Sequence, residues 1–279
     1  GGGAMIKDIV VYLTVGIKQD AAADYAVSLA NAFKAHVVGI AFIDNPKISP
    51  NLVAGIPVEL IDARRATAEG LAKEAVARFQ AAAKKAGVAT GSEILDIAPG
   101  SAGDQFGRLA RHFDLSVIRQ AGPDDKAQEP VIEAALFESG RPLIVVPYAH
   151  KQGAKFDRVM VDWDGSRTAA RAIGDAMPLL EHAKQIDVVT VATGVVKGAE
   201  NPATEIGRHL SRHGLKVEVK RIVAGSIDVT NAILNHAADT SADFMVMGGY
   251  GHSRLREYVL GGATRGILAA MTLPTLMSN

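Results

Sequence analysis

Short runs of β-branched and other apolar residues alternate along this chain with longer segments whose apolar positions recur every three or four residues. Ile9–Leu13 is the first such run, and the Ala-rich segment 21–34 that follows it has helical spacing. The runs predict buried strands and the periodic segments predict amphipathic helices. Strands that alternate with helices are typical of parallel βαβ units with right-handed crossovers, so the pattern predicts an α/β fold.

The same pattern continues to about residue 149, interrupted by the polar loop 44–57 with its three prolines. It then starts again and repeats its order to the end of the chain. A length of 279 residues fits two domains, so we expect an N-terminal half (5–149) and a C-terminal half (155–279). Strands are predicted at 36–43, 92–97, 114–118, 142–146, 156–161, 186–191, 217–223, 244–247 and 275–277, and helices at 58–86, 102–112, 130–139, 167–182, 204–213, 227–238 and 256–271.

Charge and composition narrow the possible partners and the compartment. Lys+Arg and Asp+Glu both total 30, which gives no global electrostatic case for binding nucleic acid or an anionic membrane. The chain contains no cysteine, which excludes disulfides and thiolate chemistry and fits the cytoplasm. The apolar run 6–14 is too short for a signal peptide or a membrane span, and residues 1–4 look like the remnant of a tag.

Glycines gather after the predicted strand 244–247 and again before a predicted helix. Gly248 and Gly251 follow the strand, while Gly261 and Gly262 come ten residues further on. In a parallel sheet, ligands bind at the carboxyl ends of strands, where a backbone without Cβ can approach a phosphate and helix N-termini offer free N–H groups. Such glycines also occur in ordinary turns. Two clusters at this spacing favour a phosphate site and suit a triphosphate.

The pattern Gly248-x2-Gly251-x9-Gly261 resembles the nucleotide-binding signature of the universal stress protein family, G-x2-G-x9-G-[S/T]. The likeness covers essentially the whole chain, as two tandem copies of the family's five-stranded, Rossmann-like domain. It implies a stress-response or regulatory protein that binds ATP or a related adenine nucleotide, which Mg²⁺ can accompany. One departure is Gly262, which stands where the family has Ser or Thr; a hydroxyl appears two residues later, at Thr264.

The resemblance also implies roles for residues outside the glycine clusters. Asp164 stands where the family has an acid that contacts the adenosine, and Asp162 is its rival; Asp164–Ser166 also has the pattern of a turn followed by a helix N-cap. Val191 and Met247 would flank the adenine, although core burial is the better explanation for each of them taken alone. The residues implied near the phosphates are Gly248, Gly251, Gly261, Gly262, Ala263 and Thr264. His252 and Arg254 lie between the glycine clusters, where positive charge can meet phosphate oxygens, although a solvated surface position is the more usual role of each.

The N-terminal half lacks these residues. Val15 falls where Asp164 falls, and the segment 119–125 has one glycine and a proline in place of the spaced cluster. We therefore expect one nucleotide site per chain, and a first half that is structural or whose loop 44–57 covers another ligand. In the family, fifth strands pair across the domain interface, so 142–146 and 275–277 are expected to pair within this chain as a pseudo-dimer. The sequence leaves open whether the chain also forms a homodimer.

Two other functions compete with nucleotide-dependent regulation. A slow ATP hydrolase needs a base and a metal-holding acid near the γ-phosphate, but the chain has no Walker G-x4-G-K-[ST] motif, and no catalytic residue is assigned. The histidines show no metal-ligand pattern, so no metal site is assigned either. An interaction module that binds no nucleotide is favoured by Gly262 and by the divergent first half.

Overall fold

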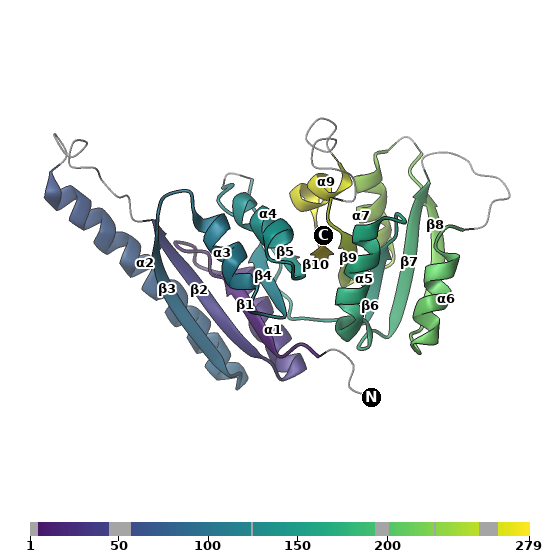
Figure 1. Ribbon diagram of the computed structural model, residues 1–279, viewed down its shortest axis with the longest axis horizontal. Helices are drawn as coiled ribbons and strands as arrows, with labels where there is room; N and C mark the ends of the chain where they lie inside the picture. The colour runs from purple at the N-terminus through teal and green to yellow at the C-terminus, as the bar shows by residue number, and fades with distance from the viewer. Residues whose placement is uncertain (1–4, 45–56, 124, 193–200, 226, 251–261) are drawn as a thin grey trace.

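The computed structural model describes residues 5–44, 57–123, 125–192, 201–225, 227–250 and 262–279. Strands and helices alternate along these parts in the predicted order (Figure 1). The strands are β1 (Asp8–Tyr12), β2 (His36–Asp44), β3 (Thr90–Ile97), β4 (Leu115–Arg119), β5 (Leu143–Val146), β6 (Arg158–Asp162), β7 (Gln185–Ala192), β8 (Val217–Val223), β9 (Phe244–Gly248) and β10 (Thr275–Ser278).

Helices link successive strands within each half. They are α1 (Ala21–Phe33), α2 (Val58–Ala86), α3 (Ala102–Ala110), α4 (Glu129–Glu138), α5 (Arg167–Leu180), α6 (Thr204–Arg212), α7 (Val229–Asp239) and α9 (Ala263–Ala270).

The strands form a ten-stranded sheet in the order β3-β2-β1-β4-β5-β10-β9-β6-β7-β8. Neighbouring strands are parallel except at the centre, where β5 and β10 are antiparallel, with Leu276 opposite Ile144. The expected pairing of the fifth strands is therefore confirmed. Because the two halves run in opposite directions at this joint, the carboxyl ends of their strands lie at opposite edges of the sheet.

Helices cover both faces of the sheet, so most strands are buried on both sides. This is why the strands read as nearly unbroken apolar runs. One face is covered by α1, α2, α5 and α6, and the other by α3, α4, α7 and α9. The first group contributes Leu29, Phe79, Ile173 and Leu210 to its core, and the second contributes Phe106, Ile132, Ile233 and Ile267.

Both halves fasten their first strand in the same way. The Asp114 carboxylate, just before β4, accepts two backbone N–H groups at the start of β1, at 2.7 and 2.9 Å. Asp243, just before β9, does the same at the start of β6, at 3.0 and 3.3 Å. This shared device, absent from the sequence prediction, strengthens the case that the two halves are duplicates.

The predicted helix over 256–271 is wrong at Gly262. This residue has an extended conformation, with φ −63° and ψ 162°, and is the N-cap of α9. A helix cannot pass through such a residue, so α9 begins at Ala263. Residues 256–261 lie outside the described part of the chain.

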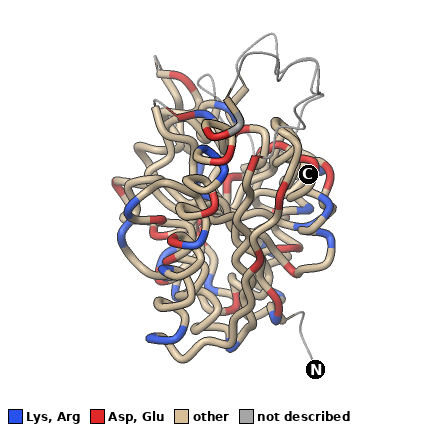
Figure 2. The backbone as a smooth tube through the Cα atoms, turned by 90° about the vertical axis from the view of Figure 1, so that its left-hand side faces the viewer, with Lys and Arg blue, Asp and Glu red and all other residues tan. Residues whose placement is uncertain are grey.

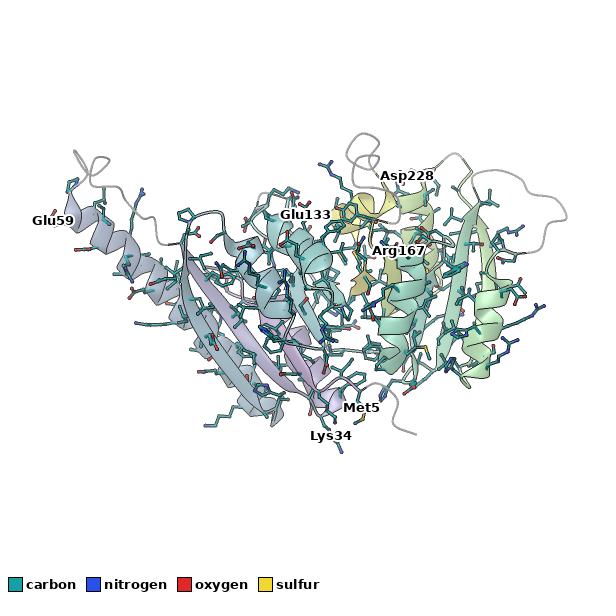
Figure 3. The ribbon with its side chains drawn as sticks, viewed as in Figure 1. Met5, Lys34, Glu59, Glu133, Arg167 and Asp228 are labelled. Carbon is teal, nitrogen blue, oxygen red and sulfur yellow. The ribbon has the colours of Figure 1, made fainter. Side chains whose placement is uncertain are left out.

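The two outer edges of the sheet are covered unequally. The 29 residues of α2 run along β3 and project beyond it, and Glu59 marks the far tip of this helix (Figures 1 and 3). At the opposite edge α6 has only nine residues and lies against β8. None of the described helices is both long and apolar enough to cross a membrane. Acidic and basic positions intermingle along the backbone drawn in Figure 2.

Candidate functional site

The candidate residues that the structure describes gather at the carboxyl ends of β6, β7 and β9. Asp162 is the last residue of β6, Val191 the second-last of β7, and Gly248 the last of β9. In the sheet order β9-β6-β7, the chain leaves β6 toward β7 on one side of β6 and later returns to β9 on the other side of β6. Doubly wound sheets bind ligands in a crevice at such a switch point, so the strand order places the candidate residues where such a crevice is expected.

Two acids stand at this crevice. Asp162 is partly buried, and its carboxyl group has no side-chain partner among the described residues. Burial, together with the smaller effect of the negative charge of Asp164, raises the pKa of Asp162 to about 7. Asp162 therefore changes protonation near neutral pH, so it can donate or accept a hydrogen bond there.

Asp164 forms the turn before the helix N-cap that the sequence suggested. Its Oδ1 accepts the Ser166 N–H at 2.8 Å in the turn that precedes α5, while Ser166 Oγ accepts the Ala169 N–H at 3.1 Å as the helix N-cap. The side chain of Asp164 is exposed, and its Oδ2 has no partner among the described residues. One oxygen therefore holds the turn and the other remains available to a ligand.

Val191 and Met247 differ in burial. Met247 is 3% exposed and belongs to the core beneath α7 and α9. Val191 is only partly buried and packs against that core from the end of β7. Of these two residues, Val191 therefore has the larger exposed side-chain surface at the ends of the strands.

Gly248 is required by packing, a reason that the sequence did not reveal. A Cβ at this position would lie 2.5 Å from the backbone nitrogen of Ala169 and 2.8 Å from the carbonyl carbon of Thr168. The end of β9 therefore touches the start of α5 directly. From the sequence alone, we interpreted Gly248 as a position where a phosphate approaches the backbone.

We expect Gly248→Ala to lower the free energy of unfolding by about 1–3 kcal/mol, because backbone atoms must move to admit the methyl group. Gly174→Ala is the matched control: no atom lies within 4 Å of a Cβ there, and its position inside α5 favours alanine. Urea denaturation of both variants checks this. Equal stability of the two variants would contradict the packing account.

The start of α9 offers backbone donors. Gly262 caps this helix without a side-chain hydrogen bond, so the first N–H groups of α9 have no such partner. Thr264 is 3% exposed, and its Oγ1 accepts the Tyr250 N–H at 3.0 Å, which ties together the two described ends that flank 251–261. Ala263 is the first residue of α9. Gly251, His252, Arg254 and Gly261 lie outside the described residues.

The N-terminal half supports this end of β9, a contribution that the sequence did not indicate. A Cβ on Gly249 would lie 2.7 Å from Leu136 of α4, and the ring of Tyr250, whose φ is 52°, lies 5.1 Å from that of Phe137. In return Gln120, just after β4, donates to two carbonyls near the end of α9, at 2.9 and 3.2 Å. These residues are more than a hundred positions apart, so no local pattern could have found them.

Strand register corrects one equivalence between the halves. The Leu13 N–H donates to the Ile40 carbonyl of β2 at 2.8 Å. In the other half, the Trp163 N–H donates to the Val189 carbonyl of β7 at 2.8 Å. The residue that matches Asp164 is therefore Thr14, and the prediction of Val15 was wrong by one position. The N-terminal half lacks an acid there in either case.

Aromatic rings fill the corresponding crevice of the N-terminal half. Tyr12 ends β1 as Asp162 ends β6, and its ring lies 5.9 Å from Phe42 of β2 and 5.6 Å from Phe106 of α3. By strand register, Phe42 stands where Val191 stands. Burial, together with the smaller effect of nearby acids, raises the pKa of Tyr12 to about 12. Bulky side chains thus replace both the acid and the open surface.

The described residues include no group of three or more His, Asp or Glu side chains arranged to hold a metal ion.

Comparison with known sequences gives matches in one family. Residues 155–279 match the universal stress protein family. Universal stress protein Slr1230 of Synechocystis is 26% identical over 60% of this chain, and the match spans 58% of that relative's length. Universal stress protein YxiE of Bacillus subtilis is 28% identical, with 44% of this chain and 98% of the relative covered.

Solved structures resemble nearly the full length of the chain. A universal stress protein from Archaeoglobus fulgidus matches with a TM-score of 0.72 and 17% identity, over 97% of this chain and 96% of its own. The protein PA1789 from Pseudomonas aeruginosa, described as functionally unknown, matches with a TM-score of 0.59 and 13% identity over 98% and 92%. Likeness at these identities shows the fold, so the predicted Rossmann-like α/β architecture is confirmed.

Proposed function

Because residues 155–279 belong to the universal stress protein family, we propose that they bind an adenine nucleotide, ATP foremost, in a stress-response or regulatory protein. The observation that carries the proposal is that Asp162 and Asp164 stand at the end of β6, while the Thr264–Tyr250 hydrogen bond holds the start of α9 beside the end of the neighbouring strand β9. Carboxylates suit ribose hydroxyls, and a helix start suits phosphate. The aromatic filling of the other crevice supports one site per chain.

In this proposal, each residue contacts a different part of the nucleotide. Asp164 accepts a ribose hydroxyl through its free Oδ2, and Asp162 completes the polar wall beside it. Val191 offers apolar surface to the base, while buried Met247 supports the floor from below. The N–H groups that follow Gly262 face the phosphates. We propose binding and assign no catalytic residue.

We expect one equivalent of ATP per chain, and we expect Asp164→Ala to weaken binding by about 1–3 kcal/mol through loss of a charged acceptor. Isothermal titration calorimetry measures both. Asp164→Asn is the informative companion, since its amide oxygen can still accept the Ser166 N–H and preserve the turn. If Asp164→Asn binds as weakly as Asp164→Ala, the charge matters; if it binds like the wild type, the turn matters.

Two outcomes would contradict this assignment. Two equivalent sites per chain would mean that the aromatic crevice also binds nucleotide. Unchanged affinity in folded Asp164→Ala would transfer the role to Asp162, which Asp162→Asn then tests. Mass spectrometry of protein purified without added ligand identifies a retained nucleotide. No bound nucleotide and no titration by ATP would favour an interaction module.

Replacing Gly262 by serine is expected to tighten ATP binding by up to about tenfold, because a hydroxyl gains one hydrogen bond to phosphate. The backbone permits the change, since φ at Gly262 is −63°. Gly262→Ala is the control that adds Cβ without a hydroxyl. We expect a smaller gain for ADP, and parallel titrations with both nucleotides check this. Equal gains would place the hydroxyl away from the γ-phosphate.

A further inference from the structure

The outer edge of the C-terminal half ends in a strand with free backbone groups. The Lys216 carbonyl accepts the Ile186 N–H at 2.9 Å, and the Ala224 N–H donates to the Ala192 carbonyl at 3.0 Å. The backbone N–H and C=O groups of the even-numbered residues of β8 therefore point toward β7. The N–H and C=O groups of the odd-numbered residues from Val217 to Val223 therefore point outward. No strand pairs with that side of β8 in the described part of the chain.

A groove of about 440 Å³ lies between this edge and α6. It is lined by Val217 and Val219 of β8 and by Arg208 and Arg212 of α6. A Cβ on Gly207 would lie 2.4 Å from the Val219 side chain, so this glycine lets α6 approach the strand closely. Val219 is nevertheless 36% exposed, because the short helix leaves the edge uncovered.

The groove is basic in a chain whose formal net charge is zero. Its charged lining residues are Arg208 and Arg212, and no described acidic residue lines it. Arg208 pairs with Glu205 on the same helix, and Lys220 with Asp187 and Glu218. Arg212 has no side-chain partner among the described residues. The local excess of positive charge favours an acidic partner.

The spacing of the two arginines suits a strand. Arg208 and Arg212 are four residues apart on α6, which separates them by about 6 Å along the helix axis. Side chains two residues apart on one face of a strand are separated by about 6.5 Å. A strand added to β8 would therefore place two alternate carboxylates near the two guanidinium groups.

We propose that the β8 edge and this groove bind an extended acidic peptide segment of a partner protein, as an added strand with carboxylates at alternate positions. The outward N–H and C=O groups of β8 provide the main-chain hydrogen bonds, as in other cases of strand addition. Arg208 and Arg212 select the acidic side chains. This site lies on the outer side of the edge strand β8, separated from β6 by β7, and the proposal does not depend on nucleotide binding.

Fluorescence anisotropy with a labelled octapeptide of alternating Glu and Val tests the proposal. We expect saturable binding that weakens at least tenfold in the Arg208→Gln, Arg212→Gln double variant. Arg64→Gln with Arg108→Gln removes the same charge from the other half and should bind like the wild type. A peptide with four Glu followed by four Val has the same composition without the alternation, and should bind at least tenfold more weakly.

The main-chain hydrogen bonds have their own readout. Val219→Pro removes an outward N–H and leaves the pairing with β7 intact, so it should abolish binding, whereas Val219→Thr retains the donor and should bind. In the wild type, hydrogen exchange should show new protection of the Val219 and Val223 amides when the peptide is bound. This measurement keeps the proposal testable if the proline variant fails to fold.

Three results would overturn the proposal. Equal affinity for the block peptide, or no new amide protection, would show charge attraction without strand addition. No binding of the alternating peptide would remove the site. Sedimentation velocity could instead show a dimer. If Val219→Pro dissociates this dimer and the peptide does not compete with it, the β8 edge binds a second copy of the chain.

Discussion

Leu276→Ala is expected to lower the free energy of unfolding by about 2–5 kcal/mol, the range for emptying a buried leucine site. Leu276 lies in β10, directly opposite Ile144 of β5, and both side chains are 0% exposed. Both residues belong to a core that continues across the joint between the halves. The cavity would therefore weaken both halves together.

Urea denaturation followed by two probes measures this effect. Trp163, the single tryptophan, reports on the C-terminal half, while circular dichroism reports on the whole chain. We expect one shared transition, shifted to lower urea in the variant. Leu60→Ala, at a side chain that is 51% exposed, should change stability by no more than about 0.5 kcal/mol. Separate transitions for the two probes would show that the joint does not couple the halves.

Asp187→Ala is expected to cost about 3 kcal/mol of stability, because it leaves two cations without their buried partner. Asp187 is 1% exposed and accepts hydrogen bonds from Arg158 Nε at 2.9 Å and Lys220 Nζ at 3.0 Å. The value lies at the low end for a broken buried pair, since Arg158 and Lys220 keep 35% and 27% of their side-chain surface exposed. Thermal and urea unfolding at neutral pH measure it.

The pH dependence gives an independent check. Burial opposes ionisation of Asp187, but the hydrogen bonds and charges of Arg158 and Lys220 outweigh it, so its pKa in the folded protein is below the ordinary value. A carboxylate with a lowered pKa stabilises the fold above its unfolded pKa, near 4, and loses this effect as the pH falls through the folded pKa. The stability difference between wild type and Asp187→Ala should therefore shrink below about pH 4. A difference independent of pH would mean that packing, and not charge, explains the loss.

The alternation of strands and helices could be predicted because it depends on local periodicity. The strand 217–223 and the helix 58–86 have the predicted bounds, and most other ends differ by one or two residues. The helix over 256–271 failed at Gly262, where an apolar pattern continues across a residue whose backbone is extended. The antiparallel joint was expected from family resemblance, since nothing in the local sequence specifies the partner of an edge strand.

The candidate site was predictable in its location but not in its physical detail. Asp164 and Gly248 stand out as sequence signals, yet the turn bond of one and the helix contact of the other depend on α5. The raised pKa of Asp162 results from burial, which a single sequence does not display. Thr14 was missed as the counterpart of Asp164 because only strand register, and not residue identity, aligns the two halves there.

The antiparallel joint between β5 and β10 has an evolutionary consequence. In a dimer of identical chains, every substitution occurs twice, so one crevice cannot change without the other. Here the two copies are covalently joined and carry independent sequences, and each still completes the central sheet of its neighbour. Tyr12 and Phe42 can therefore close one crevice while Asp162 and Val191 keep the other open. Joining the two halves in one chain thus allows the symmetric sheet to be kept while the two sites become different.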